Sequence, residues 1–135
     1  MNLPNPPPAT NLETQRFWDA TEEDRLELPR CTACDTVIWY PRERCPECGS
    51  DSVEWFEASG RGEVYSFSVT RRMPGRWGKH VPFVLAYVEL EEGPRLMTNI
   101  VDCDPEAVEV GQAVEVVFHE TEEGTKLPRF RPVSG

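Results

Sequence analysis

The sequence lacks a long apolar run of any kind. It has no basic start, no apolar stretch of signal-peptide length, and no run of about 20 apolar residues that could span a membrane. We therefore expect no membrane association and a cytoplasmic location, in which thiols stay reduced.

The sequence is also poor in the residues of common catalytic sites. It has two histidines, His80 and His119, and neither lies in a local pattern of nucleophile and carboxylate that would indicate a triad. A single cysteine, Cys103, stands apart from the others, between Asp102 and Asp104. The two carboxylates should raise the pKa of the Cys103 thiol and disfavour the reactive thiolate. The residues therefore predict no catalytic centre in this chain.

Positive charge is scarce. The 135 residues carry 14 Lys and Arg against 24 Asp and Glu, which gives a formal net charge of -10. The average field of such a protein repels a nucleic-acid backbone. The charge balance therefore disfavours nucleic acid and favours a protein or a small molecule as the partner.

The most informative feature that the sequence does contain is two Cys-x-x-Cys pairs. Their members are Cys31, Cys34, Cys45 and Cys48. Two such pairs at this separation are the ligand set of a zinc ribbon, in which two tight turns each present two thiolates to one tetrahedral metal. With sulfur at all four positions no site is left for water, so the predicted Zn²⁺ is structural and not catalytic.

Three other interpretations of the cysteines stay open. Two disulfides would suit a secreted scaffold, and a thioredoxin-like redox site would need one pair beside a helix N-terminus. Four thiolates would also hold iron in a rubredoxin-type centre. Because the chain has two matched pairs and no secretion signal, we favour one shared zinc ion.

The N-terminal part divides into an arm, a helix and the ribbon. Residues 1–9 are rich in proline and predict an extended arm, a linker or tether. Thr10-x-x-Glu13 resembles a capping box for a helix through Phe17 and Trp18, and Thr21-x-x-Asp24 is a second, weaker start signal. The two rings either pack on the protein's own ribbon or barrel, or dock on a partner protein. Ribbon strands are expected near residues 26–28, 37–40 and 53–56.

The rest of the chain reads as β structure. Residues 63–70 alternate, which predicts Tyr65, Phe67 and Val69 on one face. The further expected strands cover residues 81–90, 96–101, 114–119 and 127–133, with a short helix that begins at residues 104–106 and ends at Gly111. Three strands, a short helix and two more strands are the order of a five-stranded OB-fold barrel, with half of a β-sandwich as the alternative. We expect boundaries at 1–28 for arm and helix, 29–57 for the ribbon and 58–135 for the OB-fold.

A cationic segment joins the first two barrel strands. It contains Arg71, Arg72, Arg76, Trp77 and Lys79. In an OB-fold this loop borders the usual binding face. Arginine can grip phosphate bidentately and tryptophan can stack on an adenine, so we predict contact with a partner enzyme or with CoA. A solvated loop is the alternative.

Several short motifs in order resemble a known family. They are Phe17-Trp18, Cys31-x-x-Cys34, Pro41-Arg42, Cys45-Pro-x-Cys48-Gly49-Ser50, Ser59-Gly60-Arg61-Gly62-x-Val64-Tyr65-Ser66, Pro82-Phe83-Val84-x-Ala86-Tyr87-Val88, Glu92-Gly93-x-Arg95-Leu96, Asn99 and Leu127-Pro128-x-Phe130-x-Pro132. In this respect the chain resembles the zinc-ribbon plus OB-fold proteins that accompany acyl-CoA thiolases and thiolase-like aldolases. Asp35 departs from the pattern, because members of the family usually carry glycine there. Aspartate tolerates a left-handed turn better than most residues.

The resemblance implies a non-catalytic accessory subunit in a heteromeric complex. Its partner would be a thiolase-like enzyme acting on acyl-CoA thioesters, including aldolases that shorten steroid side chains, and the chain would help to shape the CoA-substrate site. Two other hypotheses stay open. One is a nucleic-acid-binding module, because zinc ribbons and OB-folds both serve that purpose. The other is an independent acyl-CoA carrier or hydrolase.

Overall fold

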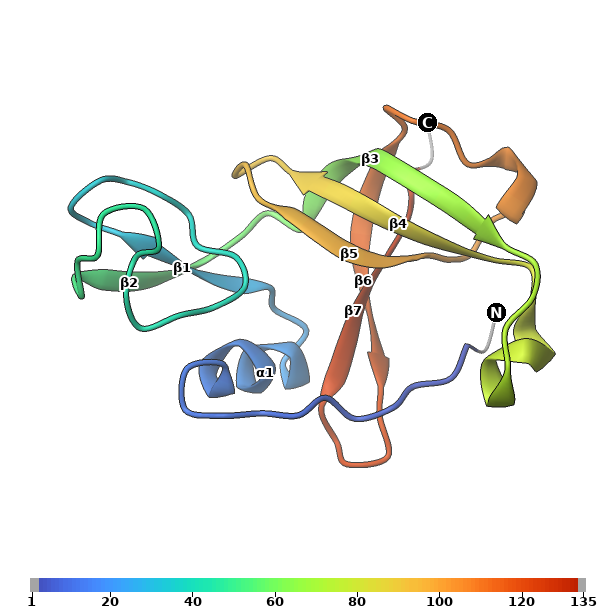
Figure 1. The fold of residues 1–135 in the computed structure, drawn as a ribbon, viewed down its shortest axis with the longest axis horizontal. Helices are drawn as coiled ribbons and strands as arrows, with labels where there is room; N and C mark the ends of the chain where they lie inside the picture. Colours follow the sequence, from blue (N-terminus) through green and yellow to red (C-terminus); the bar gives the residue numbers. More distant parts are fainter. Residues whose placement is uncertain (1–2, 134–135) are drawn as a thin grey trace.

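The chain forms a small ribbon beside a barrel. The structure is a computed structural model that describes residues 3–133. The ribbon contains strands β1 (Glu27–Cys31) and β2 (Val53–Glu57), preceded by helix α1 (Gln15–Glu22). The barrel contains β3 (Arg61–Thr70), β4 (Phe83–Leu90), β5 (Arg95–Ile100), β6 (Ala113–Glu120) and β7 (Lys126–Pro132), with short 3₁₀ helices η1 (Gly75–His80) and η2 (Pro105–Ala107). Figure 1 shows the ribbon at one end of the molecule, the barrel at the other, and α1 beneath the junction.

The five barrel strands close in the order β3-β4-β5-β7-β6. All pairs are antiparallel except β5 with β7, and η2 lies between the third and fourth barrel strands. This topology confirms the predicted OB-fold barrel. Apolar residues that alternate along the strands fill its interior, since Val64, Val88, Val114 and Phe130 are all fully buried.

A β-bulge changes the predicted face of β3. The pairing of β3 with β4 shifts between Val64 and Ser66, so one extra residue stands in β3. Val64 is fully buried, Tyr65 is 47% exposed, and Phe67 and Val69 pack against the same core as Val64. The prediction that Tyr65 shares a face with Phe67 and Val69 is therefore wrong, because a bulge reverses the inward and outward alternation along a strand.

The ribbon has two strands where three were expected. β1 and β2 pair over five residues, whereas residues 37–40 contribute one isolated bridge, between Arg30 and Val37. The strand predicted there is wrong for a steric reason. The rings of Trp39 and Tyr40 both pack on Phe17, with centroids 5.3 and 6.2 Å away. Neighbouring side chains of a strand point to opposite faces and could not both do so.

Helix α1 begins later than the capping signal suggests. The residue before the helix is Thr14, which exchanges two hydrogen bonds with Asn11: each backbone N–H donates to the other's side-chain oxygen. Glu13 instead accepts a hydrogen bond from the backbone N–H of Glu43. The capping box at residues 10–13 is therefore wrong. The second signal, at residues 21–24, is also wrong, because Thr21 lies in the last turn of α1 and donates to the carbonyl of Trp18.

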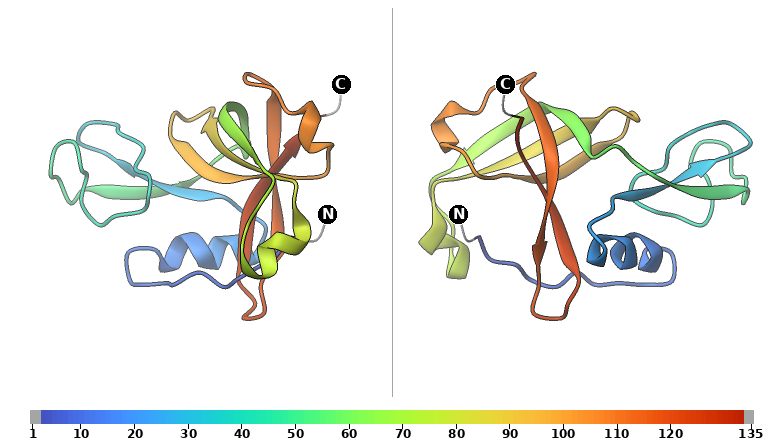
Figure 2. Two further views of the ribbon diagram at one scale, coloured as in Figure 1. Left: turned by 45° about the vertical axis from the view of Figure 1, so that its right-hand side comes forward. Right: turned by 180° about the vertical axis from the view of Figure 1, so that it is seen from behind.

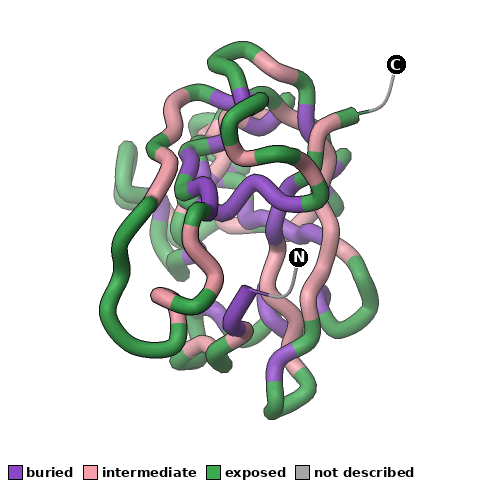
Figure 3. The backbone as a smooth tube through the Cα atoms, turned by 90° about the vertical axis from the view of Figure 1, so that its right-hand side faces the viewer, coloured by how far each residue is buried: buried purple, intermediate pink, exposed green. Residues whose placement is uncertain are grey.

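The proline-rich arm is docked on the barrel rather than free. Leu3 is 2% exposed and packs with Phe83 and Val101, and Arg129 donates a hydrogen bond to the carbonyl of Pro4. Figure 2 shows the arm running from α1 past the beginning of β7 to the region of η1, and Figure 3 shows its buried start. The tether interpretation therefore fails at residues 3–5. No helix in residues 3–133 has the length and apolar character needed to cross a membrane.

Candidate functional site

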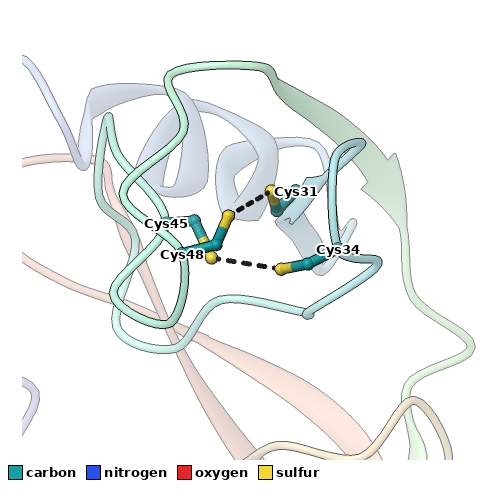
Figure 4. Close-up of side chains that lie close together, drawn as sticks. All are labelled: Cys31, Cys34, Cys45 and Cys48. Atoms are coloured by element: carbon teal, nitrogen blue, oxygen red, sulfur yellow. Dashed lines mark hydrogen bonds between the residues drawn. The ribbon is translucent and has the colours of Figure 1, made fainter.

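The four paired cysteines converge at the tip of the ribbon. Cys31 ends β1 and is fully buried, Cys45 is 2% exposed, and Cys34 and Cys48 reach the surface. Figure 4 shows the four side chains facing one another. All four Sγ atoms lie within 4.8 Å of one another, and the closest pairs are Cys31 with Cys48 at 3.6 Å and Cys34 with Cys45 at 3.5 Å. A tetrahedral ion with metal–sulfur bonds of about 2.3 Å requires sulfur atoms roughly 3.8 Å apart, so the arrangement fits zinc.

The two turns that carry the cysteines have the same backbone design. In the first, the N–H of Asp35 donates to the carbonyl of Cys31 at 2.8 Å, and in the second Gly49 donates to Cys45 at 2.9 Å. Both donor residues are left-handed, with φ of 64° and 78°. Asp35 therefore forms a turn as tight as the glycine turn, because aspartate is among the few residues that adopt this conformation readily.

The environment of Cys34 favours its ligating form. The hydroxyl of Thr36 lies 3.1 Å from Sγ, and hydrogen bonds with the side chain and then the backbone of Thr36, together with the neighbouring cysteines, lower the pKa of Cys34 to about 6. The thiolate is the form that binds a metal. With four sulfur positions and no open coordination position, the ribbon can organise the fold but offers no site for substrate activation.

The predicted contact residues Phe17 and Trp18 lie inside the molecule. Phe17 is fully buried and Trp18 is 7% exposed, with their ring centroids 4.8 Å apart. The indole Nε1 of Trp18 donates to the hydroxyl of Tyr40 at 2.9 Å. Of the two interpretations, packing on the protein's own ribbon is the one seen here. Phe17 has no surface to offer a partner, and partner contact by Trp18 stays a prediction.

The cationic segment divides into paired and unpaired side chains. Arg71 forms an ion pair with Glu106 at 2.6 Å. Arg72, Arg76 and Lys79 are exposed and form no ion pair with any residue of the described range 3–133. The ring of Trp77 packs against the ring of Phe83, with centroids 5.1 Å apart. Trp77 therefore fixes a short 3₁₀ turn from which Arg76 and Lys79 project, and Arg72 lies in the loop before this turn.

Sequence reasoning missed a cavity between the ribbon and the barrel. It has a volume of about 330 Å³. Its lining residues are Pro6, Phe17, Trp18, Trp39, Tyr40, Trp77, Leu96, Met97, Thr98, Asn99, Leu127, Pro128 and Arg129. They come from the arm, α1, the ribbon, η1, β5 and β7. Because these segments meet only in three dimensions, no local pattern could have indicated the cavity.

Two further titratable groups, Cys103 and His119, lie outside the metal site. Burial, with smaller contributions from Asp104 and Asp102, raises the pKa of Cys103. The direction is the predicted one, but the prediction named only the two carboxylates, and burial is the larger cause. The Nδ1 atom of His119 lies 2.9 Å from the guanidinium of Arg129, which can only donate. His119 is therefore a neutral acceptor that holds Arg129.

Comparison with known proteins fits both halves of this architecture. Residues 18–54 match the family model described as the rubredoxin-like zinc ribbon domain of ChsH2, and residues 55–119 match the ChsH2 C-terminal OB-fold domain. A DUF35 domain-containing scaffold protein of Methanocaldococcus jannaschii is 44% identical over 95 residues, which cover 70% of this chain and 67% of that protein. The chain belongs to the DUF35 family. The zinc ribbon domain of this family covers the four cysteines from which the metal site was predicted.

Two further similarities are to proteins that carry enzyme names. This DUF35 protein is 39% identical over 127 residues to a probable enoyl-CoA hydratase alpha subunit of Thermomonospora curvata, covering 94% of this chain but only 40% of that relative. The chain therefore spans less than half the length of this relative. Among solved structures, a chain of the Ltp2-ChsH2(DUF35) aldolase superposes with a TM-score of 0.83 at 39% identity, covering 93% of this chain and 98% of that chain.

Proposed function

We propose that this DUF35 protein is a non-catalytic accessory subunit that binds a thiolase-like enzyme acting on acyl-CoA thioesters, such as an aldolase that cleaves a steroid side chain. The observation that carries the proposal is its similarity, along nearly the full length of both chains, to the DUF35 chain of the Ltp2-ChsH2 aldolase. Its own chemistry agrees. The metal site has no open position, and the one cysteine outside the ribbon has a raised pKa.

The exposed cations are the surface that we assign to the partner's CoA site. Arg72, Arg76 and Lys79 project from one short segment of a protein with net charge -10. Such a local patch attracts a phosphorylated ligand, and arginine binds phosphate through paired hydrogen bonds. Trp77 anchors the segment on the barrel, so the cations project from a fixed position.

The structure does not favour the nucleic-acid hypothesis. That hypothesis needs Tyr65, Phe67 and Trp77 to form one stacking face on a basic surface. Tyr65 points outward with Arg95 stacked 3.8 Å from its ring, whereas Phe67 packs on the barrel core. Trp77 lies in a different apolar cluster, with Leu3 and Phe83.

The test is reconstitution with a thiolase-like enzyme. The catalytic subunit is expressed with and without this chain, and thioester cleavage is measured in both preparations. We expect copurification and activity that depends on this chain, whereas a lone monomer with no effect on any such enzyme would refute the proposal. Replacing Arg72, Arg76 and Lys79 together by Glu should raise KM for the CoA substrate. The matched control is Arg42→Glu, which reverses an exposed cation of the ribbon and should leave KM unchanged.

A further inference from the structure

The cavity lies over an open seam of the barrel. Within residues 3–133, β5 and β7 are in register at a single pair, Ile100 with Phe130, whereas β6 and β7 pair over seven residues. Before that pair the two strands diverge, and the hydroxyl of Thr98 donates across the gap to the carbonyl of Pro128 at 3.1 Å. The floor of the cavity is therefore formed by two strands, β5 and β7, whose backbone N–H and C=O groups are only partly hydrogen-bonded to each other.

Aromatic rings form the walls of this seam. Trp18, Trp39 and Tyr40 stand on the ribbon side, and Trp77 stands on the side of η1. The rings are held in place by their neighbours, since Trp39 and Tyr40 stack edge to face at 5.1 Å and Tyr40 accepts a hydrogen bond from Trp18. Rigid aromatic walls around a small polar floor are typical of sites that bind a flat apolar molecule.

The floor contains a buried cation without an anion. Arg129 is 3% exposed and lines the cavity, yet it forms no ion pair with any residue of the described range. Its Nη1 donates to the Asn5 side chain and to His119, and its Nη2 donates to the carbonyl of Pro4. A guanidinium has five N–H donors, so Nε–H and the second Nη2–H have no acceptor among residues 3–133.

Burial of an unpaired charge is costly, and a bound anion would offset that cost. Desolvation lowers the pKa of Arg129 to about 10, so the side chain stays charged at neutral pH. We propose that this cavity is a binding site for a carboxylate carried on a flat apolar group, with the carboxylate at Arg129 and the apolar group between Trp18, Trp39, Tyr40 and Trp77. A single planar fork of N–H groups matches the two oxygens of a carboxylate.

A pair of matched probes tests this site on the isolated zinc-loaded chain. The probes are 2-naphthoate and its neutral analogue 2-naphthamide, with binding followed by calorimetry and by tryptophan fluorescence. We expect 2-naphthoate to bind at least about tenfold more tightly than the amide, because hydrogen bonds to charged partners are the stronger ones. Equal affinities, or no binding of either probe, would overturn the proposal. The proposed accessory function is unaffected by either result, since the test needs no partner enzyme.

Two variants separate the site from general effects. Arg129→Gln should abolish the preference for 2-naphthoate, and a variant that still prefers the acid would overturn the proposal. Because Arg129 also holds the arm, a second variant, Met97→Glu, places a negative charge at the cavity rim from a side chain that is 61% exposed. It should weaken 2-naphthoate severalfold and leave 2-naphthamide unchanged. Val110→Glu, with an exposure of 67% and no part in the cavity, should change neither, and equal effects of the two Glu variants would also overturn the proposal.

Discussion

The sharpest test of the metal site is Cys45→Ser. Cys45 is 2% exposed, and its Sγ lies 3.5 Å from that of Cys34, so the change removes one of four ligands from the inside of the ribbon. The apolar cluster around the metal ligands is very small. It comprises Cys31, Ile38 and Cys45, with Val53 packed against it.

The magnitudes show why the metal dominates this part of the fold. Burial of Ile38, the one fully buried side chain of the cluster that is not a ligand, supplies about 1.5–3 kcal/mol. Structural zinc supplies about 10–16 kcal/mol. Loss of a group that merely supports a ligand costs roughly 10–100-fold in metal affinity, so loss of a ligand should cost more. We therefore expect the variant to lose stoichiometric zinc and the ribbon to unfold locally.

The barrel should survive this change, because most of the buried residues of the main core come from its own five strands. Zinc content and amide hydrogen exchange measure the two halves separately. Protection should be lost in β1 and β2 and kept in β4 and β6. Cys103→Ser is the matched control, since it is the same substitution at a cysteine that is no ligand, and it should keep the metal. Full zinc content with unchanged melting of Cys45→Ser would refute the assignment.

Three further predictions concern the barrel and its junction. Phe17→Ala should lower the free energy of unfolding in urea by about 3–5 kcal/mol, because the ring is fully buried, whereas Leu12→Ala, at a side chain that is 92% exposed, should change it little. Equal changes in unfolding free energy for the two variants would show that Phe17 does not stabilise the junction between ribbon and barrel. Gly62→Ala should cost about 1–3 kcal/mol, because a Cβ there would overlap the backbone carbonyl oxygen of Glu89, and an unchanged urea midpoint would contradict this. Burial, followed by the nearby Arg129, lowers the pKa of His119, so the unfolded chain binds more protons and stability falls as the pH drops below the ordinary histidine value of about 6.5. His119→Gln should flatten this part of the profile of unfolding free energy against pH, and identical profiles would exclude His119 as the cause.

The features that could be predicted from sequence are those encoded locally. The spacing of the four cysteines specifies a tetrahedral site regardless of the rest of the fold. Alternating apolar residues and polar turns specify the barrel strands, and Asp104 caps η2 by accepting a hydrogen bond from the N–H of Glu106. In each case the physical cause lies within a few residues of its effect.

The features that could not be predicted depend on distant contacts. No residue type in the sequence of β3 indicates the bulge at Tyr65. Trp39 and Tyr40 depart from strand geometry because both rings pack on Phe17. Arg129 stands at an outward position of β7, where a strand pattern predicts solvent exposure. It is buried because the arm from the other end of the chain covers it.

The anchoring of the arm also sets an order in time. Arg129 forms hydrogen bonds with Asn5 and Pro4, which precede it in the chain by 124 and 125 positions. At a synthesis rate of about 5–20 residues per second, Pro4 and Asn5 wait roughly 6–25 s for Arg129 to be made. During that interval the barrel lacks its last strand, and Pro4 and Asn5 lack the side chain that holds them in the folded protein. Docking of the arm on β7 therefore cannot be completed before Arg129 is made, and a nascent protein that stalls before β7 exposes both the incomplete barrel and the undocked arm.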